Sequence, residues 1–206
     1  MKRIGQIAIF IVVLLFSTNI FALKEAEIKR SYHDSYDYEK MGNYKDAIKS
    51  LMLVYKNYPN TYTVNLRLGW LYYLWGKYAN ARSHYKAALK AIPGSIEAML
   101  GLSLPLMAQG KWSEVEALMY KILTIDYYNY YGNLRLSIAL RMQKKYDLAE
   151  KVDRKMLTLY PSDVNFLTEL ALALNAQGKK EKAYVIFNNI LILDPKNVIA
   201  QSYIKR

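Results

Sequence analysis

One spacing dominates this sequence, because proline, glycine, aromatic and alanine residues all recur at intervals of 34 positions. The prolines of the series are Pro59, Pro93, Pro161 and Pro195. The glycines of the series are Gly42, Gly76, Gly110 and Gly178. Tyr127 and Lys144 occupy the places where the two series skip a step. A period of this length indicates a chain built from stacked copies of one supersecondary unit.

Each period contains two helical stretches. Apolar residues follow helical spacing, as in Leu66, Trp70 and Tyr73. A glycine and an aromatic residue separate two stretches of about 13–14 residues. A proline then ends the second stretch, because it lacks an N–H and restricts the residue before it. One such hairpin cannot cover its own apolar faces, so we expect neighbouring units to stack into an all-α solenoid.

These markers resemble the tetratricopeptide repeat, a helix–turn–helix unit. In the second unit the residues that carry the resemblance are Leu68, Gly69, Tyr72, Ala81, Tyr85, Ala88 and Pro93. Asn65 stands where the family prefers tryptophan. The resemblance implies a right-handed superhelix over 23–206. Its five units are 28–61, 62–95, 96–129, 130–163 and 164–197, and a short terminal helix follows over 198–206.

The first 22 residues have the pattern of a secretory signal peptide. Lys2 and Arg3 precede an unbroken apolar run from Ile7 to Phe16, and Ala22 ends an acceptable cleavage site. The alternative is an uncleaved membrane anchor, because the segment from Ile4 to Leu23 is 20 residues long, just enough to cross a bilayer. The segment predicts export to the periplasm or the cell exterior.

Chemistry for catalysis is absent from the sequence. There is no cysteine, and the two histidines, His33 and His84, lie on different units without metal-ligand spacing. No phosphate loop, nucleophile elbow or zinc-protease motif occurs. We therefore expect no catalytic residue, no metal and no cofactor.

The net charge is strongly positive. It is +12 for the whole chain and falls to +10 without Lys2 and Arg3. The second unit carries no acidic residue, and its basic patch comprises Lys77, Arg82, Lys86 and Lys90. Because export separates the chain from nucleic acid, we expect the patch to face an acidic protein, an anionic membrane or an envelope surface. A solubilising role for the lysines is the alternative.

The family resemblance also implies where a protein or peptide partner binds, because first helices of the units line the inner, concave surface. The groove residues carried over are Tyr32, Tyr36, Leu66, Arg67, Trp70, Tyr73, Leu104, Met107, Arg135, Ile138 and Arg141. Tyrosine, tryptophan and arginine often dominate binding hot spots. The alternative is that some of these residues belong to helix–helix packing.

Four local features depart from the repeat. Pro105 lies inside a first helix, where we expect a kink. Asp153 occupies an aromatic position and predicts weaker packing in the fourth unit. The tyrosines of the segment 127–131 favour packing between units, with an exposed binding patch as the alternative. The apolar segment 190–193 predicts a partly covered C-terminal end, open to self-association.

The sequence as a whole favours an exported, non-catalytic scaffold that binds a protein partner in an envelope assembly. Two alternatives remain at this stage. One is a membrane-tethered factor that self-associates, and the other is a binder of anionic cell-surface polysaccharide through its basic and tyrosine-rich surfaces.

Overall fold

The computed structural model describes residues 23–204, and the signal peptide predicted over 1–22 lies outside this range. The first helices of the units are α1 (Glu25–Lys40), α3 (Tyr62–Leu74), α5 (Ile96–Ala108), α7 (Tyr130–Met142) and α9 (Val164–Ala176). The second helices are α2 (Tyr44–Asn57), α4 (Tyr78–Ala91), α6 (Trp112–Ile125), α8 (Tyr146–Leu157) and α10 (Lys180–Leu193). The described chain ends with α11 (Val198–Ile204).

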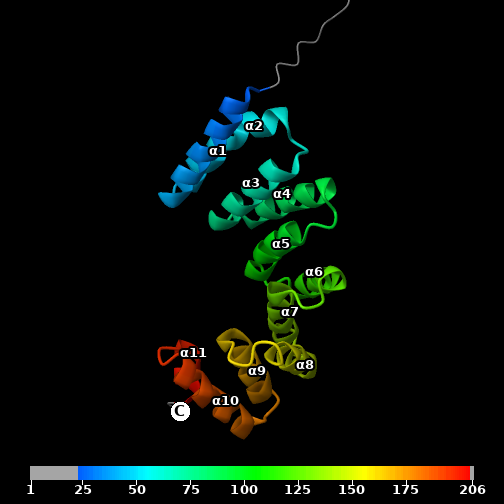
Figure 1. Cartoon of the computed structure of the whole chain (residues 1–206), viewed down its shortest axis with the longest axis vertical. Coiled ribbons are helices and arrows are strands. Elements are labelled where there is room, and N and C mark those ends of the chain that lie inside the picture. Colours follow the sequence, from blue (N-terminus) through cyan, green and yellow to red (C-terminus); the bar gives the residue numbers. More distant parts are fainter. Residues whose placement is uncertain (1–22, 205–206) are drawn as a thin grey trace, which may run out of the picture.

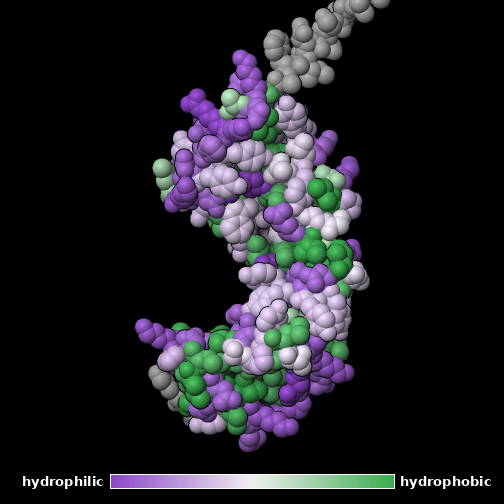
Figure 2. Space-filling view, in the orientation of Figure 1, coloured by the Kyte–Doolittle hydropathy of each residue, from purple (hydrophilic) through white to green (hydrophobic). Residues whose placement is uncertain are grey.

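The helices stack in chain order, each packing against its neighbours in the sequence, as expected for a solenoid. The stack curves into an open C, with α6 and α8 on the outer side of the curve (Figure 1). The buried apolar residues form a succession of clusters along the stack instead of one central core. The concave side of the curve is visibly hollowed in the space-filling view (Figure 2).

The turn between the two helices of each unit explains the glycine series. Gly76 has a φ of 73°, and the following Lys77 N–H donates to the Tyr72 carbonyl at 2.8 Å, which closes the end of α3. Glycine favours this left-handed backbone because it has no Cβ. Lys144 adopts the same conformation with a φ of 62°, and Lys145 donates to the Leu140 carbonyl. The fourth unit therefore keeps the turn without its glycine.

Pro105 lies inside α5, which is one α-helix from Ile96 to Ala108, and the kink expected there stays a prediction. Pro105 itself is buried, so neighbouring side chains pack around its ring. The helix is therefore continuous on both sides of the residue.

One core position shows how the units differ. At matching places in the five second helices stand Leu51, Tyr85, Met119, Asp153 and Phe187. The Tyr85 ring packs between two glycines, Gly69 and Gly101, where an added Cβ would lie 2.9 Å and 2.3 Å from ring atoms. The Asp153 side chain is fully buried, and neither of its oxygens has a hydrogen-bond partner within residues 23–204.

Candidate functional site

The main cleft on the concave side spans the first three units and reaches the fourth. Its volume is about 540 Å³. We call it the concave cleft, and its lining residues are Tyr32, Tyr36, Thr63, Leu66, Arg67, Trp70, Tyr85, Glu97, Leu100, Gly101, Leu104, Tyr131 and Arg135. They come mainly from the first helices α1, α3, α5 and α7. Most of the wall is aromatic or aliphatic, and two guanidinium groups and the Glu97 carboxylate interrupt it.

The first of these cations, Arg67, is neutralised within the chain. Its guanidinium pairs with the Glu39 carboxylate and donates to the Ser35 carbonyl at 3.2 Å. Glu39 also accepts from the Trp70 indole N–H at 2.7 Å. The Arg67 Cζ atom lies 3.8 Å from the centre of the Tyr36 ring, within the range of a cation–π contact. These contacts fix one end of the cleft and leave the half-exposed face of Tyr36 open.

The second cation, Arg135, has no carboxylate partner among residues 23–204. It donates to the Leu100 carbonyl and to the Ser103 hydroxyl, both at 2.6 Å. Burial lowers the pKa of its guanidinium, although the neighbouring tyrosines act in the opposite direction. Because a partly buried cation gains from a nearby negative charge, Arg135 favours an anionic group in the cleft.

The structure brings seven of the eleven predicted groove residues into this cleft. They are Tyr32, Tyr36, Leu66, Arg67, Trp70, Leu104 and Arg135. Arg67 differs from expectation, because its ion pair with Glu39 leaves it only 8% exposed.

The other four predicted residues lie outside the concave cleft. Tyr73 packs against Trp70 and Tyr78, with ring centres 5.8 Å and 6.1 Å apart. Met107 packs on the central cluster, and Ile138 is half-buried on α7. Arg141 borders a different, smaller pocket near α11.

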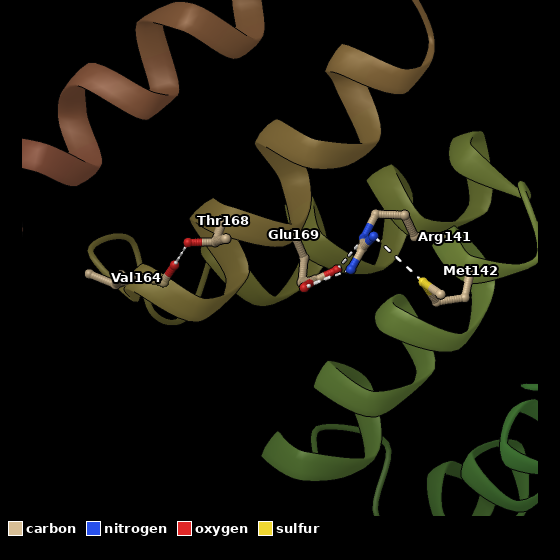
Figure 3. Close-up of polar contacts among 5 residues, drawn as sticks. All are labelled: Arg141, Met142, Val164, Thr168 and Glu169. Carbon is tan, nitrogen blue, oxygen red and sulfur yellow. Dashed lines mark hydrogen bonds and ion pairs between the residues drawn. The ribbon is translucent and has the colours of Figure 1, made fainter. Parts of the chain in front are cut away.

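Arg141 belongs to an ion pair between α7 and α9. Its Nε and Nη2 atoms donate to the Glu169 carboxylate at 2.6 Å and 3.3 Å (Figure 3). Asp153 lies close to this pair, beside Ser137. Burial is the main reason that the pKa of Asp153 is raised well above its usual value, and Glu169 adds to the rise. The region is therefore an internal polar cluster within the fourth and fifth units.

Sequence reasoning missed Thr63, Tyr85, Glu97, Gly101 and Tyr131 as cleft residues. Tyr85 occupies a packing position of the repeat, but its ring also forms part of the cleft wall. Gly101 lies directly against that ring, so the missing side chain at this position helps to open the cleft. The signal that could have identified it is the glycine at a place where the next unit has Arg135.

The basic patch of the second unit is mostly accessible. Lys77, Lys86 and Lys90 are exposed, whereas Arg82 is half-buried and its Nε atom has no hydrogen-bond partner in the described range. The Lys77 ammonium lies 5.3 Å from the Trp75 ring centre. The patch therefore comprises three exposed lysines and one partly packed arginine.

The tyrosines of 127–131 are divided between the two expected roles. Tyr130 packs against Tyr160 and Phe166, and its hydroxyl donates to Asp163 at 2.8 Å. Tyr127, Tyr128 and Tyr131 are each more than half exposed. The packing interpretation therefore holds for Tyr130 and is wrong for the other three, since they protrude from the junction of the third and fourth units.

The C-terminal end is partly covered. The short α11 packs its Tyr203 ring on Phe187 at 4.5 Å, and Ile190 is fully buried. Ile192 and Val198 remain 78% exposed. Hydrophobic surface gathers over α9 to α11 in Figure 2.

Over residues 23–204 no three acidic or histidine side chains converge as a metal site would require. Within the same range, no helix has both the length and the apolar character needed to cross a bilayer.

A tetratricopeptide repeat family model matches residues 35–96. A search of curated protein sequences finds no match. A tetratricopeptide repeat protein from Parabacteroides merdae has a similar structure, with a TM-score of 0.80 and 18% identity, covering 87% of this chain and 71% of that one.

Two structures of proteins called MamA are also similar. One, from Desulfovibrio magneticus, gives a TM-score of 0.77 at 14% identity and covers 86% of this chain and 99% of that one. Another gives a TM-score of 0.73 at 17% identity and covers 84% and 94% of the two chains. At these identities the likeness concerns the fold.

Proposed function

Because this chain is a tetratricopeptide repeat protein, we propose that it is a non-catalytic scaffold that binds a partner protein in the concave cleft. The observation that carries the proposal is the cleft itself, an aromatic and aliphatic hollow of about 540 Å³ formed by helices of four successive units. Concave, largely apolar sites with a few convergent polar groups are typical binding sites.

The cleft favours an extended peptide segment with apolar side chains and one acidic group. Tyr36 and Tyr131 offer accessible ring faces, and Leu100 and Leu104 offer aliphatic wall. Arg135 supplies the one guanidinium of the cleft that lacks an ion pair within residues 23–204. A carboxylate of the bound segment would therefore pair with Arg135, while Arg67 stays paired to Glu39.

We further propose that the scaffold acts outside the cytoplasm, in an envelope assembly. The support is the signal-peptide pattern over residues 1–22 of the sequence. Cell fractionation locates the protein, and mass spectrometry of its N-terminus distinguishes a cleaved signal from a retained anchor.

A second candidate is a scaffold that also self-associates through its C-terminal end. The exposed side chains of Ile192 and Val198 favour it, because contiguous apolar surface often marks an interface. Light scattering over a range of protein concentrations tests it, and a monomer throughout that range would contradict it.

The concave cleft is tested by a double substitution, Tyr36→Ala with Tyr131→Ala. Both side chains are about half exposed, so their loss leaves the fold in place and removes aromatic contact area from the cleft. We expect a partner cross-linked from envelope extracts to be lost. The measurement is quantitative co-purification with the wild-type chain and the variant.

The matched control is Tyr184→Ala, which removes an equally exposed tyrosine from α10, away from the cleft. Circular dichroism confirms that both variants are folded. If the double variant keeps the partner as well as the control does, the concave cleft is not the binding site.

A further inference from the structure

A second groove lies on the outer side of the curve, between the second helices of the third and fourth units. It has a volume of about 440 Å³. Leu123 of α6 and Val152 of α8 form its apolar wall, and Tyr120 and Tyr127 stand at its edge. Two ammonium groups, Lys151 and Lys155, complete it, and its lining contains no carboxylate. We call it the outer groove. Figure 1 shows α6 and α8 on the outer side of the curve.

The same place at the junction of the first two units is filled by the chain's own side chains. Tyr55 and His84 occupy the repeat positions of Leu123 and Val152, 68 residues earlier. The His84 ring stacks on Tyr72 at 5.2 Å and meets Tyr55 at 5.2 Å. A leucine and a valine are too small to fill this space, so it is open between α6 and α8.

The filled junction between α2 and α4 therefore indicates the shape of a ligand that would fit the open junction between α6 and α8. Two planar rings fit between the second helices of the first two units, with the His84 Nδ1 atom 3.0 Å from the Asn65 side-chain oxygen. Asn133 stands at the repeat position of Asn65, and its side-chain oxygen accepts a hydrogen bond from the Lys155 ammonium at 2.5 Å. An aromatic ring supplied from outside would occupy the space that His84 and Tyr55 occupy in the earlier units.

The charge of the outer groove indicates which groups should flank the aromatic ring of a ligand. The Lys155 ammonium lies 4.1 Å from the Tyr127 ring centre, and burial lowers the pKa of this lysine. Lys151 is exposed on the adjacent turn of α8 and forms no ion pair within residues 23–204. Two neighbouring cations without an acidic residue in the lining favour a segment with negative charge beside its aromatic side chain.

We propose that the outer groove is a second binding site, which takes an acidic peptide segment of a partner protein. An aromatic side chain of that segment inserts between Leu123 and Val152, and its carboxylates pair with Lys151 and Lys155. This site is independent of the concave cleft, so the solenoid would hold two protein segments on opposite faces. The proposal goes beyond the scaffold function and does not depend on which partner fills the concave cleft.

The test uses the full chain and a fluorescein-labelled synthetic peptide with one phenylalanine flanked on each side by two glutamates. Fluorescence anisotropy measures its affinity. A peptide with alanine for the phenylalanine should bind about tenfold more weakly, because the aromatic ring supplies the buried area. A peptide with glutamine for every glutamate should also bind more weakly.

Two variants of the chain test the site itself. Leu123→Tyr with Val152→His rebuilds the filling of the first junction without changing the charge, and we expect it to abolish binding of the peptide. Lys151→Glu should weaken binding about tenfold through charge repulsion. Its matched control is Lys49→Glu, which reverses an exposed lysine at the same repeat position of α2 and should bind like the wild type.

The Tyr36→Ala, Tyr131→Ala variant distinguishes binding in the outer groove from binding in the concave cleft. It should leave the affinity for the acidic peptide unchanged, because neither residue lines the outer groove. The proposal is overturned if the peptide does not bind, or if it binds equally well to the filled variant. It is also overturned if the concave-cleft variant loses the peptide while Lys151→Glu keeps it, since the peptide would then occupy the other face.

Discussion

The second and fourth units have the same helix pair but place different chemistry at its centre. In the second unit the central position holds the Tyr85 ring, packed against two glycines. In the fourth unit the same position holds the carboxyl group of Asp153, next to Ser137 and the Arg141–Glu169 pair. The turn of the second unit uses Gly76, and that of the fourth uses Lys144 at a positive φ.

The difference shows that the backbone of a repeat is kept even when the residue at its central core position or at its turn is replaced by one of very different chemistry. Neighbouring units bury most of each hairpin, so a poor residue at one position is supported by contacts on both sides. The fourth unit lies between two others and is therefore supported in this way. We expect the unusual residues of the fourth unit to lower its free energy of unfolding. Replacing them with the residues of other units should therefore raise that free energy.

Removing the ring of Tyr85 should change the free energy of unfolding more than any other substitution considered below. Tyr85→Ala leaves a cavity beside Gly69 and Gly101, and we expect it to lower the free energy of unfolding by about 4 kcal/mol. Urea unfolding followed by circular dichroism measures the change. Tyr184→Ala is the control, because an exposed tyrosine on α10 should change the free energy by less than about 0.5 kcal/mol. Equal losses in both variants would contradict the role of Tyr85.

Replacing Asp153 should act in the opposite direction. Asp153→Met introduces the residue found at the same position of the third unit, and we expect a gain of about 2 kcal/mol at neutral pH. The gain arises because a buried carboxylate without hydrogen bonds is costly to ionise. Thermal unfolding of the two chains measures it.

The pH dependence identifies the cause of that gain. The pKa of Asp153 is higher in the folded chain than in the unfolded one, so the folded state binds the proton more tightly. Stability linked to this group is therefore complete below about pH 4 and is lost as the pH rises through the folded pKa. The advantage of Asp153→Met should grow over that range. Asp147→Met, at an exposed position of α8, should show no such growth.

The turn gives the smallest expected effect. Lys144→Gly should raise the free energy of unfolding by about 1 kcal/mol, because a left-handed backbone is strained for a residue with a Cβ. The reciprocal change, Gly76→Lys, should lower it by a similar amount. If both substitutions destabilise, the Lys144 side chain makes a contribution that outweighs its backbone strain.

The helices and turns could be predicted from the sequence because they depend on residues that are close together in the chain. The 34-residue period places Gly76 and Lys144 at the same turn, and both adopt a positive φ. The aromatic character of the cleft could also be predicted, since Tyr32, Tyr36 and Trp70 all line it.

Contacts between units could not be predicted in this way. Arg67 finds Glu39, 28 residues earlier, because stacking brings the end of α1 to the middle of α3. The period alone does not specify how far one hairpin rotates on the next, so it could not show that Arg67 would be buried. The same reason explains why the cleft includes Tyr131 and excludes Tyr73, although both are tyrosines of first helices.

Two of the ion pairs between units, Glu39–Arg67 and Arg141–Glu169, also restrict the order in which the repeats can be joined. Glu39 and Arg141 share one repeat position, and their partners Arg67 and Glu169 share another, so the same bridge occurs twice with its charges exchanged. A recombined chain with the first unit placed before the fifth would bring Glu39 against Glu169. One with the fourth placed before the second would bring Arg141 against Arg67. The charges at these positions therefore fit the first unit to the second and the fourth to the fifth, and these four repeats are not interchangeable modules.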